Sequence, residues 1–469
     1  MEFDPVLLSR LQFAFLISFH IVFPAFTIGL AAWLATLEGA RLATGHAIYR
    51  RVFDFWLKVF ALSFGMGVVT GIVMAFQFGT NWSELAKKAG SIQGPLLGYE
   101  TFTAFLLEAT FFGVMLFGRE RVSPRFYLFA CCMVSLGTMF SSFGILANNS
   151  WMQVPLGHTI VDGKIIPEDW WAITTGPIMR VRWPHMVLAA FLTTGMCVAA
   201  TGAWYTLRDV HRAEARVMLH WGLSLVALLI PIQLFFGHLT GLYVLKHQPT
   251  KFVAIEARWK TEQPASEVLI AIPDEARERN LFAIEIPRLG SFIASGNSTA
   301  REIGLDTFPP QDRPPVVIPF FGFRIMVGMG LIMLAVSWLG CWLRFRGRLE
   351  TTRWYLWGTF FAFPSGFIAV LSGWYTAEVG RQPWVVYGLL RTRDAVTPSL
   401  TTGDVVVSLA SYGLVYAFIY SFGVHYIYKL LRQGPTGEAK AIPAATASRP
   451  MAYADLAETA TGGGLGSGR

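Results

Sequence analysis

Charged residues are scarce in this chain. Asp, Glu, Lys and Arg together make up 14% of its 469 residues, whereas soluble globular domains usually carry about 25%. Hydrophobic residues make up 54%, and they gather in long runs. The net charge of +8 does not indicate nucleic-acid binding, because the basic residues lie in short loops between these runs and not on one face. The composition therefore argues against a soluble domain and predicts that lipid surrounds most of the chain.

Cysteine is scarce as well. The four cysteines all lie inside apolar runs: Cys131, Cys132, Cys197 and Cys341. None belongs to a C-x-x-C pair or to a C-x-x-C-H haem attachment motif. We therefore expect small buried thiols, and neither a disulfide framework nor a zinc site.

Nine apolar runs are long enough to cross a membrane, because each reaches the roughly 20 residues that span about 30 Å of hydrocarbon as a helix. They cover residues 8–37, 54–78, 96–118, 126–149, 185–207, 217–241, 316–343, 354–377 and 404–430. The first run does not resemble a cleaved signal, since Glu2 and Asp4 stand where a basic region is expected and the run is too long. The sequence predicts an all-α, polytopic membrane protein with about nine transmembrane helices.

Arginine clusters in the loops that follow the first, third, fifth and seventh predicted helices. These residues are Arg41, Arg50, Arg51, Arg119, Arg121, Arg125, Arg208, Arg212, Arg216, Arg344, Arg346, Arg348 and Arg353. Positively charged loops usually face the cytoplasm. We therefore expect the N-terminus outside and the C-terminus in the cytoplasm, which requires an odd number of helices.

The chain divides into four parts. Residues 1–241 hold helices one to six, and residues 316–432 hold helices seven to nine. Between them, residues 242–315 form a polar outer loop that is long enough to have its own structure and function. Residues 433–469 are rich in Gly, Ala, Thr and Pro, which predicts a disordered cytoplasmic tail.

Ionisable residues inside the predicted helices are expensive to place in lipid, so each one suggests a function. They are His20, Glu100, Glu108, His185, His220, His238, Arg324, Glu378 and His425. For any one buried histidine, a hydrogen bond between helices is the more common explanation. Functional roles therefore need support from the depth and grouping of these residues.

His185 shares a depth near the outer end of the bundle with a possible soft metal ligand, Met326. His185 lies in the first turn of helix five, and Met326 lies in the first two turns of helix seven. Histidine and methionine form a known axial pair for six-coordinate haem iron. Arg324 is suited to pairing with a haem propionate. Spacing alone favours Met326 as an ordinary core residue, because methionine is common in apolar helices.

Two other groups of polar residues each line one helix face. Trp374, Glu378 and Arg381 follow helical spacing at the end of helix eight. This carboxylate and arginine are either a simple ion pair or an iron ligand with a propionate clamp. On helix three, Glu100 and Glu108 are about 12 Å apart along the axis. Stepped carboxylates suit a proton relay, although hydrogen bonding between helices explains them equally well.

Six stretches in order resemble subunit I of the cytochrome bd family, and the similarity extends to about residue 432. They are residues 8–13 followed by His20, 76–82, 100–108, 151–153, 323–327 and 380–384. The resemblance implies a low-spin haem b held by His185 and Met326. It implies two further high-spin haems with His20 and Glu378 as axial ligands, one a haem b and the other a haem d or a third haem b. Which ligand serves which haem stays open, and Trp374 is implied to lie between haems.

The resemblance also assigns proton and quinol residues. Glu100 is implied to lie near the oxygen-reactive haem, and Glu108 and Ser141 are implied to belong to a proton path from the cytoplasm. Lys251 and Glu256 match the quinol-oxidising residues of the outer loop. This outer loop is short, as in the short-loop branch of the family. The chain also resembles the cyanide-insensitive branch.

The implied function is a terminal oxidase that oxidises quinol at the outer face and reduces O2 to water without pumping protons. The implied partners are a subunit II, a small single-helix subunit, quinol, O2 and the lipid of the bacterial cytoplasmic (inner) membrane, with no nucleic acid. A haem-copper oxidase is disfavoured, because it needs six membrane histidines and at most five are present here. A proton-coupled secondary transporter without haem, using Glu100, Glu108 and Glu378, is the alternative from another class.

Overall fold

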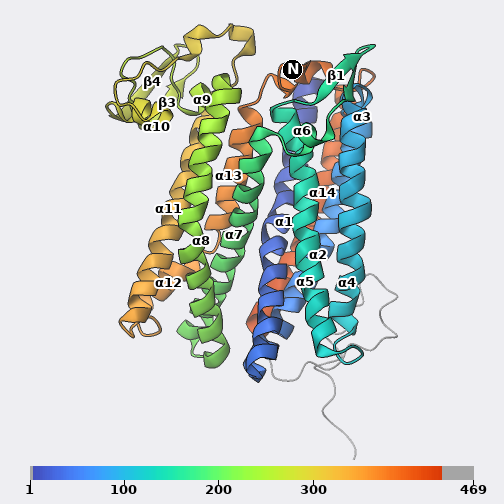
Figure 1. Ribbon diagram of the computed structural model, residues 1–469, viewed down its shortest axis with the longest axis vertical. Coiled ribbons are helices and arrows are strands. Elements are labelled where there is room, and N and C mark those ends of the chain that lie inside the picture. Colours follow the sequence, from blue (N-terminus) through green and yellow to red (C-terminus); the bar gives the residue numbers. More distant parts are fainter. Residues whose placement is uncertain (1–3, 436–469) are drawn as a thin grey trace, which may run out of the picture.

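The computed structural model describes residues 4–435, and the part of the predicted tail from residue 436 onward lies outside this range. Within the described residues, nine helical segments are long and apolar enough to cross a membrane, which confirms the predicted architecture. They are α1 (Pro5–Thr44), α2 (Ala47–Thr80), α3 with η1 and α4 (Ser83–Phe117), α5 (Pro124–Gln153), α6 with α7 (Trp170–Arg208), α8 (Arg212–His247), α11 (Val317–Phe345), α12 with α13 (Arg353–Val379) and α14 (Thr402–Gln433). Figure 1 shows these helices side by side along the long axis.

Local signals fix where several helices begin and end. The side chain of Asp4 accepts a hydrogen bond from the backbone N–H of Val6 at 3.0 Å, and Pro5 follows at the first helical position of α1. Gly45 ends the same helix with a left-handed φ of 72°. At the start of α14, Thr401 and Asp404 form a reciprocal capping box. These caps satisfy backbone groups that the helices leave without partners.

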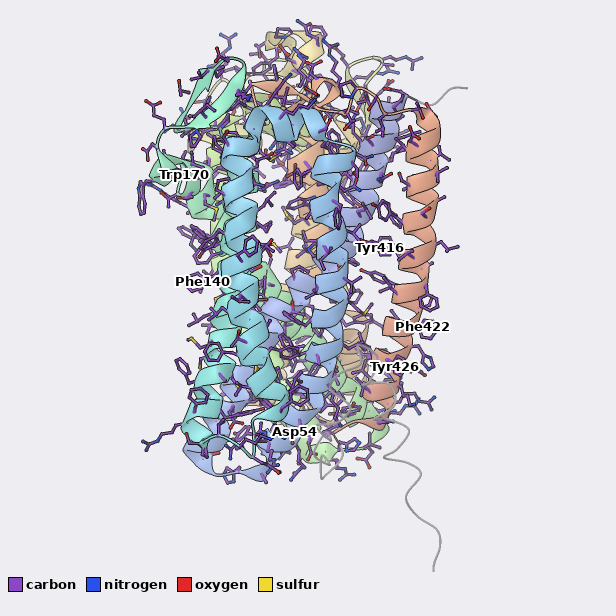
Figure 2. All side chains as sticks on the ribbon, turned by 90° about the vertical axis from the view of Figure 1, so that its right-hand side faces the viewer. Asp54, Phe140, Trp170, Tyr416, Phe422 and Tyr426 are labelled. Atoms are coloured by element: carbon purple, nitrogen blue, oxygen red, sulfur yellow. The ribbon has the colours of Figure 1, made fainter. Side chains whose placement is uncertain are left out.

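The bundle has two different ends. One carries α9 (Pro249–Ile255), β3 (Glu267–Asp274), β4 (Arg279–Ile286) and α10 (Leu289–Ser295), which lie beside the ends of α8 and α11 in Figure 1; we call it the loop end. The arginine-rich loops share the opposite end, because successive helices alternate in direction. Figure 2 marks this opposite end with Asp54, which lies 3.7 Å from Arg119.

The loop end also carries smaller elements. They are the hairpins β1 (His158–Val161) with β2 (Lys164–Pro167) and β5 (Trp384–Val386) with β6 (Leu390–Arg391), and the 3-10 turns η2 (Leu305–Thr307), η3 (Pro310–Asp312) and η4 (Thr392–Asp394). The strands β3 and β4 pair antiparallel and pack, with α9, on the start of α11. The segment between α8 and α11 therefore contains helices, strands and 3-10 turns of its own.

Helices approach closely where glycine faces a neighbour. A Cβ added at Gly202 on α7 would come within 2.5 Å of the backbone nitrogen of Leu219 on α8. Small residues at such crossings allow close packing in a membrane, where no hydrophobic force drives helices together. The outer faces of the helices are apolar: on α14, Figure 2 shows Tyr416 directed inward and Phe422 at the edge, and the residues are 1% and 46% exposed.

Some helices extend beyond the predicted runs. The third segment begins at Ser83, whereas its apolar run begins near residue 96, and α8 continues to His247. Hydropathy detects only the part of a helix that lies in hydrocarbon. The additional residues of α3 begin with a polar turn, in which Glu84 and Lys87 pair at 2.6 Å.

Candidate functional site

A buried polar cluster surrounds Glu378 in the last turn of α13, at the loop end. One carboxylate oxygen of Glu378 accepts hydrogen bonds from the amides of Asn149 at 3.0 Å and Gln153 at 3.1 Å. The other accepts from Arg381 at 2.5 Å. Asn149 and Gln153 are four residues apart on α5, so both point from one helix face. The ion pair that helical spacing suggested for Glu378 and Arg381 is therefore present.

Arg381 has more donors than this cluster uses. Its side chain is 6% exposed, and its Nε and Nη1 atoms are buried with no hydrogen-bond partner among the described residues. A buried guanidinium with unused donors is costly unless an acceptor reaches it. Arginine pairs well with carboxylates, so the site fits an anionic group such as a haem propionate. Glu378 and Arg381 together thus fit an iron ligand beside a propionate clamp.

Lys251 reaches the same cluster from the outer loop. It lies in α9, is 2% exposed, and donates hydrogen bonds to the side-chain oxygens of Gln153 and, at 2.8 Å, Gln248. Burial lowers the pKa of Lys251 well below its usual value, and the negative charge of Glu378 partly opposes that shift. Gln153 therefore joins the predicted quinol residue Lys251 to the predicted haem ligand Glu378 through one side chain.

Glu256 ends α9, close to the start of α11. It is 7% exposed, and its Oε2 lies 3.6 Å from Nη2 of Arg324. Arg324 also donates hydrogen bonds to the backbone oxygens of Val268, Leu269 and Ile255. Arg324 thus ties the outer loop to α11. Its predicted pairing with a haem propionate stays a prediction, and Arg381 is the arginine of the two whose unused nitrogens fit that role directly.

The predicted low-spin ligands stand on different helices beside glycines. On α7, Nδ1 of His185 is buried with no hydrogen-bond partner among the described residues. A Cβ added at Gly237 would lie 3.4 Å from Cε1 of His185, and one at Gly373 would lie 2.7 Å from Sδ of Met326. The unpartnered Nδ1 of His185 fits an axial haem ligand, while its Nε2 lies 3.4 Å from the amide nitrogen of Gln233, and the sulfur of Met326 packs directly against Gly373. The pairing of His185 with Met326 on one haem stays a prediction.

His20 is held in place by α2. Its Nδ1 lies 2.9 Å from the hydroxyl of Thr70, and a Cβ added at Gly71 would lie 3.2 Å from its Cε1. A fixed Nδ1 leaves Nε2 as the atom for a metal. Among residues 4–435, no three His, Cys, Asp or Glu side chains converge on one point. Trp374 packs at the contact of α1 with α13.

The predicted proton residues lie on the third and fourth spanning segments. Glu100 begins the π-helical turn η1 (Glu100–Ala104), and its carboxylate accepts a hydrogen bond from Ser141 at 3.0 Å. Glu108 is 6% exposed, and its Oε1 has no partner in the described part of the chain. A Cβ added at Gly137 would lie 2.7 Å from Cγ of Glu108. Ser141 is therefore hydrogen-bonded to Glu100, and its implied place with Glu108 on the proton path stays a prediction.

The remaining membrane histidines lie elsewhere. His220 is 3.2 Å from Glu350 at the arginine-rich end. His238 lines a cavity of about 430 Å³ between α8 and α10, together with Leu242 and Phe292. The residues that sequence reasoning missed are Gln248 and the bridging role of Gln153. Of these two residues, only Gln153 could have been identified from the sequence, because it is the last residue of the stretch 151–153 that resembles the family.

Comparison with known proteins gives a consistent result. The profile of the family described as cytochrome bd terminal oxidase subunit I matches residues 8–435. Cytochrome bd ubiquinol oxidase subunit 1 of Bacillus subtilis is 32% identical over 443 residues, which cover 92% of this chain and 94% of the relative. Cytochrome bd-II ubiquinol oxidase subunit 1 of Escherichia coli is 31% identical, with coverage of 92% and 97%. The bd oxidase structure from Geobacillus thermodenitrificans superposes with a TM-score of 0.86 at 27% identity, covering 92% of this chain and 99% of that one.

Proposed function

The chain belongs to the cytochrome bd terminal oxidase subunit I family, and from this premise we propose how its residues perform quinol oxidation and oxygen reduction. It is a multi-pass membrane subunit of a haem-containing quinol oxidase, and it functions with a subunit II. Family membership over residues 8–435 leaves no support for the transporter alternative. The specific sites and the direction of proton movement below are our proposals.

One observation carries the proposal. The side chain of Gln153 accepts a hydrogen bond from Lys251 and donates one to Glu378 at 3.1 Å. The residue that we assign to quinol and the residue that we assign to haem iron are thus two hydrogen bonds apart. A donor site and an acceptor site in such contact suit electron transfer over a short path.

Quinol is oxidised at the outer loop. Oxidation releases protons, so a base must stand beside the ring hydroxyls. The buried carboxylate of Glu256 accepts a proton, and it lies 3.6 Å from the guanidinium of Arg324. Lys251 lies on the same short helix and orients a ring oxygen by donating a hydrogen bond to it. The depressed pKa of Lys251 suits this contact, since the group loses a proton readily.

The bundle holds haem near the loop end. His185 and Met326 would hold a low-spin haem b, His20 and Glu378 would each ligate one of two high-spin haems (a haem b, and a haem d or third haem b), and Arg381 would pair with a propionate. When bound, these groups supply electron transfer and the reduction of O2 to water. The protein contributes fixed ligands: Thr70 orients His20 at 2.9 Å, and Asn149 and Gln153 orient Glu378.

Protons for water come from the arginine-rich end, which we assign to the cytoplasm of a bacterial cell. Glu108 lies about 12 Å farther from the loop end than Glu100 along the helix axis. Protons therefore pass from Glu108 to Glu100, where Ser141 completes the local hydrogen bonding. Because quinol protons leave at the other face, charge crosses the cytoplasmic membrane without a pump. We also propose a small single-helix subunit as a further partner.

Glu256→Gln tests the quinol site. In the purified complex, this variant should slow quinol-driven oxygen consumption at least about tenfold, because the amide cannot accept a proton. Oxygen consumption with an artificial one-electron reductant that reacts with the haems should stay at the wild-type rate. Equal loss of both activities, or no loss of either, would place the quinol site elsewhere.

A further inference from the structure

One arginine serves two carboxylates in the outer loop. Nη2 of Arg324 lies 3.6 Å from Oε2 of Glu256 and 3.7 Å from Oε1 of Glu267. Glu256 comes from the end of α9, and Glu267 is the first residue of β3. The fold thus brings a second acidic side chain to the proposed base, although the two are far enough apart in sequence that no helical spacing relates them.

Both carboxylates are buried. The side chain of Glu256 is 8% exposed and that of Glu267 is 12% exposed, while Arg324 is 16% exposed. Oε2 of Glu256 has no hydrogen-bond partner among the described residues, so it has an unused acceptor. The other nearby cation, Arg258, also acts on Glu302. Arg324 is therefore the main positive charge beside the two buried carboxylates. One cation balances one carboxylate, so the arrangement favours a state in which Glu256 and Glu267 share one proton.

We propose that Glu267 relays quinol protons from Glu256 to the water outside the loop end. This inference rests on the proposed function, because it takes Glu256 as the quinol base. Glu267 does not touch the substrate. It is a positioning and relay residue that acts through Glu256.

The relay conserves protons and charge. At rest, Glu256 is a carboxylate and Glu267 is a carboxylic acid. A quinol hydroxyl gives its proton to Glu256, and the quinol electrons pass to the haems of the oxidase. Both acids are then neutral, so Arg324 is left buried without an anion, and Glu267 releases its proton to outer water. The proton on Glu256 moves to Glu267, and the resting state returns for the second quinol proton.

The electrostatics of Glu267 support this order. Burial, followed by the negative charge of Glu256, raises the pKa of Glu267 to about 8 even though Arg324 and Arg258 act to lower it. The group is therefore protonated at neutral pH and able to exchange its proton near the working pH.

Glu267→Gln tests the relay in the purified complex. The amide cannot carry a proton, so kcat for quinol should fall about tenfold at pH 7 while KM changes less than about twofold. Wild type should show a change in kcat near pH 8, where Glu267 titrates, and this change should vanish in Glu267→Gln. Glu267→Asp keeps a carboxyl group and should restore most of kcat and the pH step. Glu285→Gln, an exposed position opposite Val268 in the same hairpin, is the matched control and should behave as wild type.

The outcomes separate this inference from the proposed function. A wild-type rate in Glu267→Gln, or a lower rate with the step near pH 8 intact, overturns the relay. If Glu256→Gln slows quinol oxidation in the same assay, the quinol site stands even then. If Glu256→Gln also keeps the wild-type rate, the proposed quinol site itself fails.

Discussion

Replacing Gln153 with leucine should impair both ends of the proposed electron path. Leucine has a similar volume but no polar atoms. The change removes an acceptor from Lys251 and from Gln248, and it removes a donor from Glu378. Lys251 keeps Gln248 at 2.8 Å, and Glu378 keeps its other two donors.

The size of the effect follows from the charges involved. Two of the lost hydrogen bonds involve Lys251 and Glu378; a hydrogen bond to the charged carboxylate of Glu378 contributes about 1.5–3 kcal/mol, and one to Lys251, whose pKa is depressed, contributes about 0.5–1.5 kcal/mol. The free energy of unfolding should therefore fall by about 3 kcal/mol. A loss of about 1.5 kcal/mol in orienting Lys251 corresponds to roughly a tenfold lower rate of quinol oxidation. The absorption of the haem at Glu378 should shift as well, because its ligand loses a hydrogen bond.

Gln248→Leu is the matched control. Gln248 contacts Lys251 and Gln153 but forms no hydrogen bond with Glu378. This variant should therefore slow quinol oxidation without moving the haem spectrum. Quinol-driven oxygen consumption and visible spectra of both variants measure the difference. An unchanged haem spectrum in folded Gln153→Leu protein, or the same spectral shift in Gln248→Leu, would refute the bridge.

Two further predictions concern the haem ligands and the proton path. Met326→Leu should lose an axial ligand and turn the low-spin absorption partly high-spin, and an unchanged low-spin band in folded protein would contradict the assignment. Glu108→Gln should cut steady-state oxygen consumption at least about tenfold, because the amide carries no proton. In rapid mixing, quinol should still reduce the low-spin haem of Glu108→Gln at the wild-type rate, and a wild-type turnover rate would remove Glu108 from the path.

Most of the fold could be predicted because lipid imposes a simple rule on apolar length. The nine runs and the shared end of the arginine-rich loops follow from hydropathy and charge alone. The polar start of α3 at Ser83 escaped the prediction because it is helical without being apolar. The π-helical turn at Glu100 escaped it too, since no local sequence rule marks such a turn.

Single residues of the candidate site could be predicted from the sequence, but most contacts between them could not. Helical spacing relates Glu378 to Arg381, and the structure joins them. The contacts of Gln153 with Lys251 and of Arg324 with Glu267 join segments about 100 and 60 residues apart. No periodicity records such contacts, because they depend on how the outer loop folds over the bundle. Sequence motifs therefore indicated single candidate residues and did not indicate the contacts between them.

The proton stoichiometry of the reconstituted oxidase tests the central claim most directly. In our proposal, quinol is oxidised at the loop end and protons are taken up at the arginine-rich end. No further proton is carried across the membrane. Proteoliposomes driven by quinol should release about one proton outside per electron, because each quinol gives up two protons and two electrons. A ratio near two would show that protons are pumped and would contradict the account.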